Sequence, residues 1–148
     1  MHILLTNDDG IYAGGINLLY KYLSQKHDVY VIAPNEEKSG CSNAITMKSE
    51  LKIETLSENK FAVNGFTADC VNIGLKGNLI PKVELVISGI NHGPNCGDDV
   101  YFSGTVAGAR VGHIYGISSI AISLDSYNES TNLSDASEFL LNYIDNIV

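Results

Sequence analysis

Short apolar runs alternate along the chain with longer stretches in which apolar residues recur at helical spacing. Residues 1–6 form an apolar run that ends at a polar turn, and residues 28–33 form a second run that stops at Pro34. Both runs have the length and composition of buried strands. The segment between them, residues 15–26, is predicted to be a helix from the spacing of Ile16, Leu19, Tyr20 and Leu23. Strand, helix and strand in this order form a βαβ unit, which gives parallel pairing.

The rest of the chain continues this alternation of strands and helices. Helices are predicted at three further segments, residues 67–76, 105–115 and 134–148. Core strands are predicted at residues 83–87 and 117–124. Three short β-prone segments separated by polar turns predict a small antiparallel insertion: residues 44–47, 51–56 and 60–64. We expect a single α/β domain over residues 1–148, with a Rossmann-like three-layer α/β/α arrangement and a mostly parallel sheet.

The predicted helices also carry local signals. Thr67 or Asp69 is expected near the start of the helix 67–76, and Ser134 is a candidate cap for the last helix. The helix 105–115 has small residues that allow close packing, namely Ala107, Gly108, Ala109 and Gly112. The last helix is amphipathic, with one apolar stripe formed by Ala136, Phe139, Leu140, Tyr143 and Ile144.

Composition excludes several classes of partner. The formal net charge of −8 argues against DNA, RNA or an anionic membrane as partner, because phosphate-rich surfaces are bound through Lys and Arg. A small phosphorylated ligand remains compatible with this charge. No apolar stretch approaches the ~18 residues of a membrane span, and no secretory leader pattern opens the chain. Three widely spaced cysteines, Cys41, Cys70 and Cys96, match neither a zinc site nor a disulfide framework, so we expect a cytoplasmic protein with reduced thiols.

Two adjacent carboxylates, Asp8 and Asp9, follow the first apolar run directly. Ligands of open α/β sheets bind at the carboxyl ends of strands, which is where this pair is placed. Two like charges repel unless a cation lies between them, and magnesium, manganese or calcium prefers such oxygen ligands. The alternative is a polar loop in which one Asp caps the next helix.

Two further predicted loops leave the same edge of the sheet. They add neutral oxygens to the Asp pair, from Ser39 and Asn43 in one loop and from Asn91 and Asn95 in the other. Carboxylates combined with neutral oxygens form an ordinary magnesium or manganese site. Taken singly, Ser39 and Asn91 are equally typical of turns.

The long segment 88–103 has no periodicity, and loops of this length are usually functional or disordered. It ends at Ser103-Gly104-Thr105, where free backbone N–H groups and two hydroxyls at a helix start can bind an anion. The alternative for Ser103 and Thr105 is simple N-capping. His92 and His113 are conceivable acid–base groups, but a lone histidine is more often a surface or core residue, and neither is included in the predicted site.

Four segments together resemble the SurE family, stationary-phase survival proteins that are metal-dependent nucleoside monophosphate phosphatases. They are residues 3–11 (Ile-Leu-Leu-Thr-Asn-Asp-Asp-Gly-Ile), Ala33-Pro34 with Ser39, Ala68-Asp69-Cys70-Val71, and Ser88 to Asn95 running on to Ser103-Gly104-Thr105-Val106. The resemblance places metal ligands at Asp8, Asp9, Ser39 and Asn91. It places the phosphate pocket at Asn95 and at Ser103, Gly104 and Thr105. Asn43 completes the predicted substrate-binding set.

The chain departs from the family pattern at three points. Phe66-Thr67 stands where the family usually has Thr-Pro, and Val111 stands where an acidic residue is common. Family members continue past Val148 with a C-terminal portion that helps to oligomerise and to shape the pocket. On the resemblance, we still expect a homodimer or higher homo-oligomer, because the apolar remainder of the last helix favours association.

The resulting hypothesis is hydrolysis of nucleoside 5′-monophosphates with one divalent cation, magnesium or manganese, and with Asp8 and Asp9 as catalytic residues. One alternative is a domain that binds metal and nucleotide without turnover, because the chain is short. A receiver-type signalling domain would need an Asp and a Lys where Ser88 and Ser123–Leu124 stand. A dinucleotide-binding module would need a glycine spacing that Gly10, Gly14 and Gly15 do not have.

Overall fold

The computed structural model describes residues 1–128 and 130–147. One six-stranded sheet has the order β3-β4-β2-β1-β5-β6. Its strands are β1 (His2–Thr6), β2 (Asp28–Pro34), β3 (Ile53–Ser57), β4 (Lys60–Val63), β5 (Leu85–Asn91) and β6 (Ser118–Ser123). The helices are α1 (Gly14–Leu23), α2 (Thr67–Lys76), α3 (Asp99–Phe102), α4 (Gly104–Ile114) and α5 (Leu133–Ile147). None of the described helices is long and apolar enough to cross a membrane.

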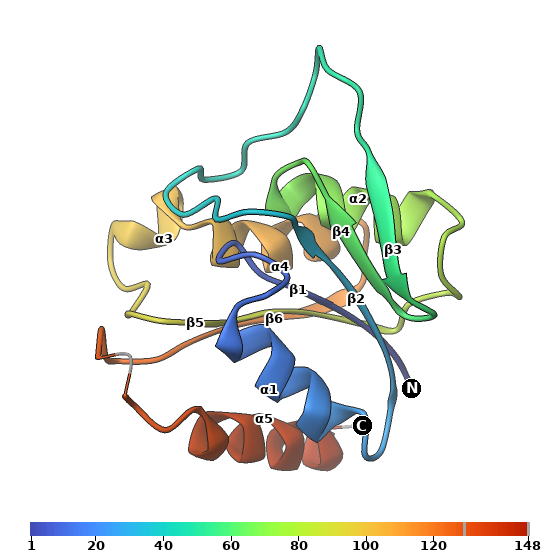
Figure 1. The fold of residues 1–148 in the computed structure, drawn as a ribbon. Helices are drawn as coiled ribbons and strands as arrows, with labels where there is room; N and C mark the ends of the chain where they lie inside the picture. The colour runs from blue at the N-terminus through green and yellow to red at the C-terminus, as the bar shows by residue number, and fades with distance from the viewer. Residues whose placement is uncertain (129, 148) are drawn as a thin grey trace.

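Helices cover both faces of the sheet, as Figure 1 shows. Helices α1 and α5 pack together on one face, and α2 and α4 pack together on the other. Strand β1 pairs in parallel with β2 on one side and with β5 on the other, and β5 pairs in parallel with β6. The predicted Rossmann-like three-layer α/β fold is therefore confirmed.

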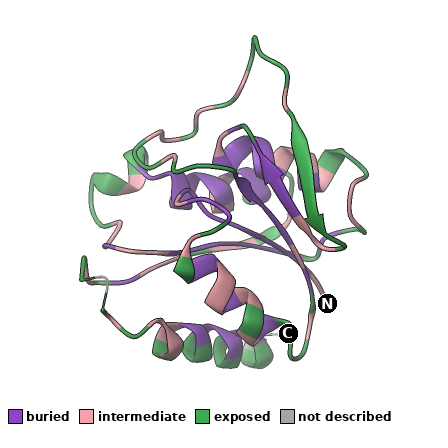
Figure 2. Cartoon of the chain, viewed as in Figure 1, coloured by how far each residue is buried: buried purple, intermediate pink, exposed green. Residues whose placement is uncertain are grey.

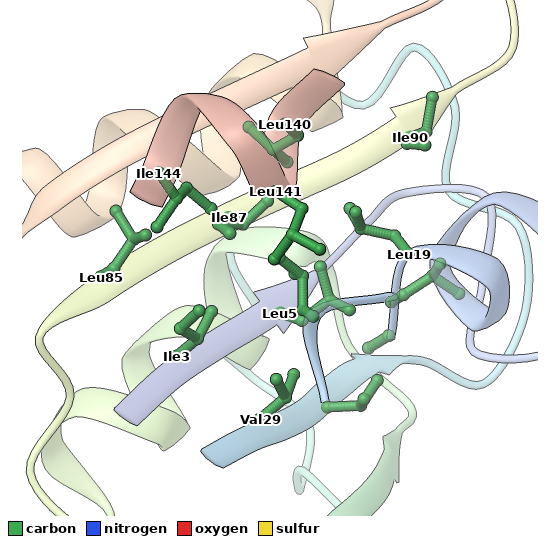
Figure 3. Close-up of a cluster of buried hydrophobic side chains, with 14 of the residues drawn as sticks. Ile3, Leu5, Leu19, Val29, Leu85, Ile87, Ile90, Leu140, Leu141 and Ile144 are labelled. Atoms are coloured by element: carbon green, nitrogen blue, oxygen red, sulfur yellow. The ribbon is translucent and has the colours of Figure 1, made fainter. Parts of the chain in front are cut away.

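The central strands are buried on both sides, which explains why they are continuously apolar in the sequence. Figure 2 shows the sheet centre as buried, whereas β3 at the edge is exposed throughout. Ile3 and Leu5 of β1 pack in the core cluster with Leu140 and Ile144 of α5, which is drawn in Figure 3. Leu4, which points to the other face, belongs to a second cluster beneath α2 and α4.

Helix α4 lies very close to the sheet. A Cβ added at Gly112 would come within 2.9 Å of Cγ2 of Val86 on β5. Gly112 is four residues beyond Gly108, where an added Cβ would come within 3.0 Å of Cβ of Ser88. The two glycines thus allow one helix face to approach β5, as the small residues of this segment predicted.

The β insertion differs from the prediction in two ways. Residues 44–47 form no strand, and the other two segments form the hairpin β3–β4. Strand β4 also pairs in parallel with β2, so the hairpin extends the main sheet instead of forming a separate one. Hydrogen bonds to a distant strand determine this placement, and local propensity does not report them.

Strand β5 is longer than predicted. It continues through Ser88 and Asn91, although that stretch was expected to be a loop. Ser88 pairs with Thr6 of β1, and Asn91 pairs with Ser123 of β6 after a register shift. The polar residues and Gly89 gave a loop signal, but pairing on both sides keeps the segment in the sheet.

Helix α5 also departs from the expected pattern. Its buried apolar residues, in the described part of the helix, are Leu140, Leu141 and Ile144, whereas Phe139 is 65% exposed and Tyr143 is 47% exposed. The buried stripe is therefore rotated away from these two aromatic rings. Ser134 lies inside the helix, and its backbone N–H donates to Oδ1 of Asn132. The cap prediction at Ser134 is thus wrong.

Candidate metal and phosphate site

The carboxyl ends of β1, β2 and β5 open into one cavity of about 440 Å³. Its size is within the range of about 300–1,000 Å³ that is usual for small-ligand pockets. Six of the predicted site residues line it: Asp8, Asp9, Ser39, Asn91, Asn95 and Ser103. Parallel pairing of β1 with β2 and β5 explains the convergence, because it brings the three strand ends to one edge. A second cavity, of about 350 Å³, lies near Lys76 and Lys82, and none of the described residues that line it is acidic.

Asp8 is held in place by several hydrogen bonds. Its side chain is only 3% exposed, and its Oδ1 accepts a hydrogen bond of 2.5 Å from Oγ1 of Thr105. Its backbone oxygen accepts from the N–H of Lys38 at 2.7 Å. The preceding residue, Asn7, is fully buried and donates through Nδ2 to the carbonyl of Gly10. These contacts fix one carboxylate of the pair at the base of the cavity.

Asp9 has a different environment. Burial, followed by the negative charge of Asp8, raises the pKa of Asp9 to about 6. Glu37 contributes in the same direction, and His92 opposes it. The Oδ2 atom of Asp9 is buried and has no hydrogen-bond partner in the described part of the chain. An unpaired buried carboxylate oxygen beside a second carboxylate has the chemistry of a cation ligand.

The neutral side chains at this edge of the sheet could also act as oxygen ligands of a cation. Nδ2 of Asn91 donates to the carbonyl oxygens of His92 and Gly93, so its Oδ1 is the oxygen left to act as a ligand. Ser39 lies on the exposed loop after β2 and also lines the cavity. Within residues 1–128 and 130–147, no cluster of three or more His, Cys, Asp or Glu side chains could hold a metal. A cation here therefore needs the neutral oxygens as well as the Asp pair.

The predicted phosphate segment divides into two parts. Ser103 is the N-cap of α4 and accepts the N–H of Val106 through Oγ at 3.1 Å, which confirms the capping interpretation, and it also lines the cavity. Gly104 lies against Asp8, where an added Cβ would come within 2.8 Å of Cβ of Asp8. Thr105 is fully buried, and its hydroxyl is directed to Asp8.

The other two residues predicted to bind substrate, Asn95 and Asn43, differ in their position relative to the cavity. Asn95 lines the cavity and donates through Nδ2 to Oγ of Ser123 at 2.7 Å. Asn43 is exposed on the loop after β2 and is not among the described residues that line the cavity. Its role in substrate binding stays a prediction.

The structure adds cavity residues that the sequence did not single out. Glu37, Asp99, Phe102 and Tyr127 line the cavity, and so does His92, which had been left out of the predicted site. Phe102 and Tyr127 are large side chains that are nonetheless 64% and 76% exposed. No motif in the sequence identified them, because their exposure depends on loops that come together only in the fold.

The loop from residue 35 to residue 52 is fastened to the rest of the molecule at separate points. Near its middle, Thr46 donates to the carboxylate of Asp69 through its N–H, at 3.1 Å, and through Oγ1, at 2.7 Å. Asp69, which is 3% exposed, also accepts from the N–H of Phe66 at the start of α2. Ser42 donates its N–H to the carbonyl of Phe102. These contacts hold the loop that carries Ser39.

Comparison with known proteins gives a consistent result. The family model described as Survival protein SurE matches residues 3–148. A protein from Pseudoalteromonas atlantica named 5′-nucleotidase SurE is 47% identical over 140 residues, which is 95% of this chain and 56% of that protein. A protein of the same name from Leptospira interrogans is 43% identical over 144 residues, covering 97% of this chain and 58% of its own length.

A solved structure is also similar to the chain. The crystal structure of SurE protein from Aquifex aeolicus has a TM-score of 0.93 and 37% sequence identity to it. The match covers 99% of this chain and 60% of that one. The chain thus spans less than two thirds of the length of these relatives.

Proposed function

This chain belongs to the SurE family, and on that premise we propose that it is a divalent-metal-dependent phosphatase. The proposed reaction is hydrolysis of nucleoside 5′-monophosphates to nucleoside and phosphate. The name 5′-nucleotidase of the relatives supports the reaction class. The observation that carries the proposal is the Asp8–Asp9 pair: the buried Oδ2 of Asp9 has no hydrogen-bond partner among the described residues, and oxygen-bearing side chains line the same cavity.

Four residues would hold the cation, which we take to be magnesium or manganese. Asp8 and Asp9 provide the negative charge, and Ser39 and Asn91 provide neutral oxygens from neighbouring strand ends. When bound, such a cation supplies positive charge that stabilises phosphoryl oxygens and assists the ionisation of water. Thr105 orients the Asp8 carboxylate through its hydroxyl. Asp8 and Asp9 are catalytic in this proposal because they place that charge.

The phosphate would lie between the cation and the start of α4. Ser103 and Asn95 line the cavity there and offer a hydroxyl and an amide. Gly104 and Thr105 contribute the backbone of the first helical turn, where N–H groups and the helix dipole favour an anion. Asn43, on the exposed loop after β2, is assigned to the substrate in this proposal.

The cellular setting is part of the same proposal. All three cysteines are free, which suits a reducing compartment, and we place the protein in the cytoplasm. We expect a homodimer or a higher homo-oligomer, in line with the exposed aromatic residues of α5. The net charge of −8 supports a small substrate over a nucleic-acid polymer or an anionic membrane as the partner.

The test compares Asp8→Asn with Asp28→Asn, whose side chain is 71% exposed at the start of β2. Melting is measured after chelation and again with manganese, and hydrolysis of adenosine 5′-monophosphate is measured in parallel. Without metal, Asp8→Asn should be about as stable as wild type, because Asn keeps an acceptor for Thr105 and one repelling charge is gone.

With manganese, Asp8→Asn should gain far less stability than wild type, because linked stability follows metal concentration relative to its dissociation constant. Its turnover should fall about a hundredfold or more, since several kcal/mol of charge stabilisation are lost. The Asp28→Asn protein should behave as wild type in both measurements. Full activity of chelated wild type, or equal manganese shifts in all three proteins, would reject the proposal.

A further inference from the structure

An exposed aromatic ring lines the cavity of the proposed metal and phosphate site. Tyr127, in the loop after β6, is 76% exposed and lines the cavity together with Asp8 and Asn91. Single exposed aromatic residues are common on protein surfaces. This one differs because most of the other side chains that line the cavity carry carboxylate, amide or hydroxyl groups. Such groups can bind a cation or a phosphate, whereas an aromatic ring can bind neither in this way.

The loop that carries Tyr127 is tied to the proposed metal ligands. The N–H of Leu124 donates to the carbonyl of Asn91 at 2.9 Å, and the N–H of Gly93 donates to the carbonyl of Ser126 at 2.9 Å. Oγ of Ser126 lies 2.8 Å from Oγ1 of Thr131 across the same turn. The position of Tyr127 is therefore set relative to Asn91, and the ring does not belong to a free loop tip.

One edge of the Tyr127 ring lies against Gly93. A Cβ added at Gly93 would come within 2.3 Å of Cε1 and 2.6 Å of Cδ1 of Tyr127. Only a glycine leaves room for the ring at this point, and its φ of +94° also favours glycine. A ring that is held along its Cδ1–Cε1 edge and is otherwise largely exposed is preorganised to receive a flat group, because little ordering is needed on binding.

We propose that Tyr127 is the stacking platform for the base of the nucleotide whose phosphate lies between the Asp pair and the start of α4. This inference rests on the function proposed above and specifies its substrate class. Stacking on a tyrosine tolerates every base, because every base has a π-face. The site should therefore accept nucleoside monophosphates with different bases and should discriminate against phosphate monoesters without an aromatic group.

The test uses hydrolysis of adenosine 5′-monophosphate and of ribose 5-phosphate by wild type, Tyr127→Phe, Tyr127→Leu and Tyr127→Ala. The Leu variant keeps apolar bulk against Gly93 but lacks the π-face. Losing the stacking contact should raise KM for the nucleotide about 5- to 100-fold in the Leu and Ala variants, with kcat nearly unchanged. The Phe variant should match wild type, and KM for ribose 5-phosphate should be the same in all four proteins.

Two other variants provide controls. Tyr143→Ala removes a tyrosine that is 47% exposed on α5, outside the cavity, and should leave both KM values unchanged. Phe102→Ala removes the other exposed ring of the cavity. If Phe102→Ala raises KM for the nucleotide and the Leu and Ala variants of Tyr127 do not, the assignment to Tyr127 is overturned.

A binding measurement separates this inference from the proposed function. Calorimetry with adenosine, which has the base but no phosphate, should detect binding to wild type and Tyr127→Phe but much weaker binding to Tyr127→Ala. If both phosphate esters are cleaved and adenosine binds neither wild type nor the variants, the proposed stacking on Tyr127 is wrong, but the proposed phosphatase activity is supported. If neither ester is cleaved with manganese present, the phosphatase is wrong, and adenosine binding alone decides whether Tyr127 holds a base.

Discussion

At the scale of single residues, Asp8 and Asp9 have different surroundings although they are neighbours in the chain. Asp8 is almost completely buried and accepts a hydrogen bond from the hydroxyl of Thr105, a residue that is 97 positions away. Asp9 is partly exposed, and its buried Oδ2 has no hydrogen-bond partner in residues 1–128 and 130–147. The sequence placed both carboxylates at the strand end. It did not reveal which of the two carboxylates accepts a hydrogen bond from the protein, because that depends on where α4 begins against β1.

The raised pKa of Asp9 predicts a specific pH dependence for Asp9→Asn in the absence of metal. The folded-state pKa of about 6 is above the unfolded value of 3.8. Stability linked to the protonated form is therefore fully present below pH 3.8 and is lost as the pH rises through about 6. Asn does not ionise, so the variant should escape this loss.

We expect the melting temperature of Asp9→Asn to rise relative to that of wild type by about 2–4 °C between about pH 4 and pH 7. This shift corresponds to about 1 kcal/mol of unfolding free energy, a value that allows for solvent screening of a partly exposed carboxyl. The measurement is calorimetric melting with chelator present across this pH range. Asp28→Asn, at an exposed carboxylate, serves as the control. A constant or falling difference between Asp9→Asn and wild type would contradict the assigned pKa.

At the scale of elements, the strands and helices with strong periodicity were predictable, and the elements fixed by distant partners were not. Strand β1 and helix α2 appear within one or two residues of their predicted bounds. Strand β5 runs four residues beyond its predicted end at Ile87, because β1 and β6 pair with its polar end. This extension matters for the site, since it brings Asn91 to a strand terminus instead of a loop.

The loop of residues 35–52 gives a second example. Thr46 was expected in a short strand of residues 44–47, but it lies in this loop and donates hydrogen bonds to Asp69 on α2. Asp69 is one of the residues that carried the family resemblance, yet its part in holding this loop could not be inferred from the sequence. The bond joins residues 23 positions apart, and only the fold brings them together.

Thr46→Val should loosen this loop without altering any side chain of the cavity. The substitution removes the 2.7 Å bond from Oγ1 to Asp69 and keeps the β-branched shape and the backbone N–H. Loss of one such bond, about 1 kcal/mol, should raise the population of the open loop about fivefold. The rate of limited tryptic cleavage after Lys48, which is exposed on the loop, should increase by the same factor.

Cleavage after Lys82 provides an internal reference, because this exposed lysine precedes β5 and lies outside the loop. Its rate should be equal in Thr46→Val and wild type. If both sites were cleaved faster in the variant, the effect would be global unfolding instead of local opening. Unchanged cleavage after Lys48 would show that Thr46 does not restrain the loop.

At the scale of the whole molecule, strand order determines where the site lies. Strand β1 is central, and the chain crosses to β2 on one side and later to β5 on the other. Reversal of strand order at such a point opens a crevice at the carboxyl ends of the strands, which is where ligands bind in open α/β sheets. The position of the cavity therefore follows from the strand order. The alternation of strands and helices in the sequence predicted parallel strands with their carboxyl ends at one edge, but it did not give the order that makes β1, β2 and β5 neighbours.

The exposed aromatic pair on α5 leads to the prediction for assembly. Phe139 and Tyr143 stack with ring centroids 6.2 Å apart, and both face away from the core that Leu140 and Ile144 enter. We expect self-association through this face, so that light scattering at high concentration gives a mass above the 15.9 kDa of one chain. The double variant Phe139→Ser/Tyr143→Ser should shift the equilibrium toward monomer, whereas Ile114→Ser, at another exposed apolar position, should not.

Salt dependence distinguishes an apolar contact from an ionic one in this assembly. Each chain has a formal charge of −8, so two copies repel at low ionic strength. Added salt screens this repulsion within a Debye length of about 8–10 Å and leaves apolar burial intact. Association of wild type should therefore become stronger between about 20 and 300 mM salt, and the double variant should show little change. Association that weakens with salt, or a wild-type protein that stays monomeric at every concentration, would rule out the α5 face as the contact.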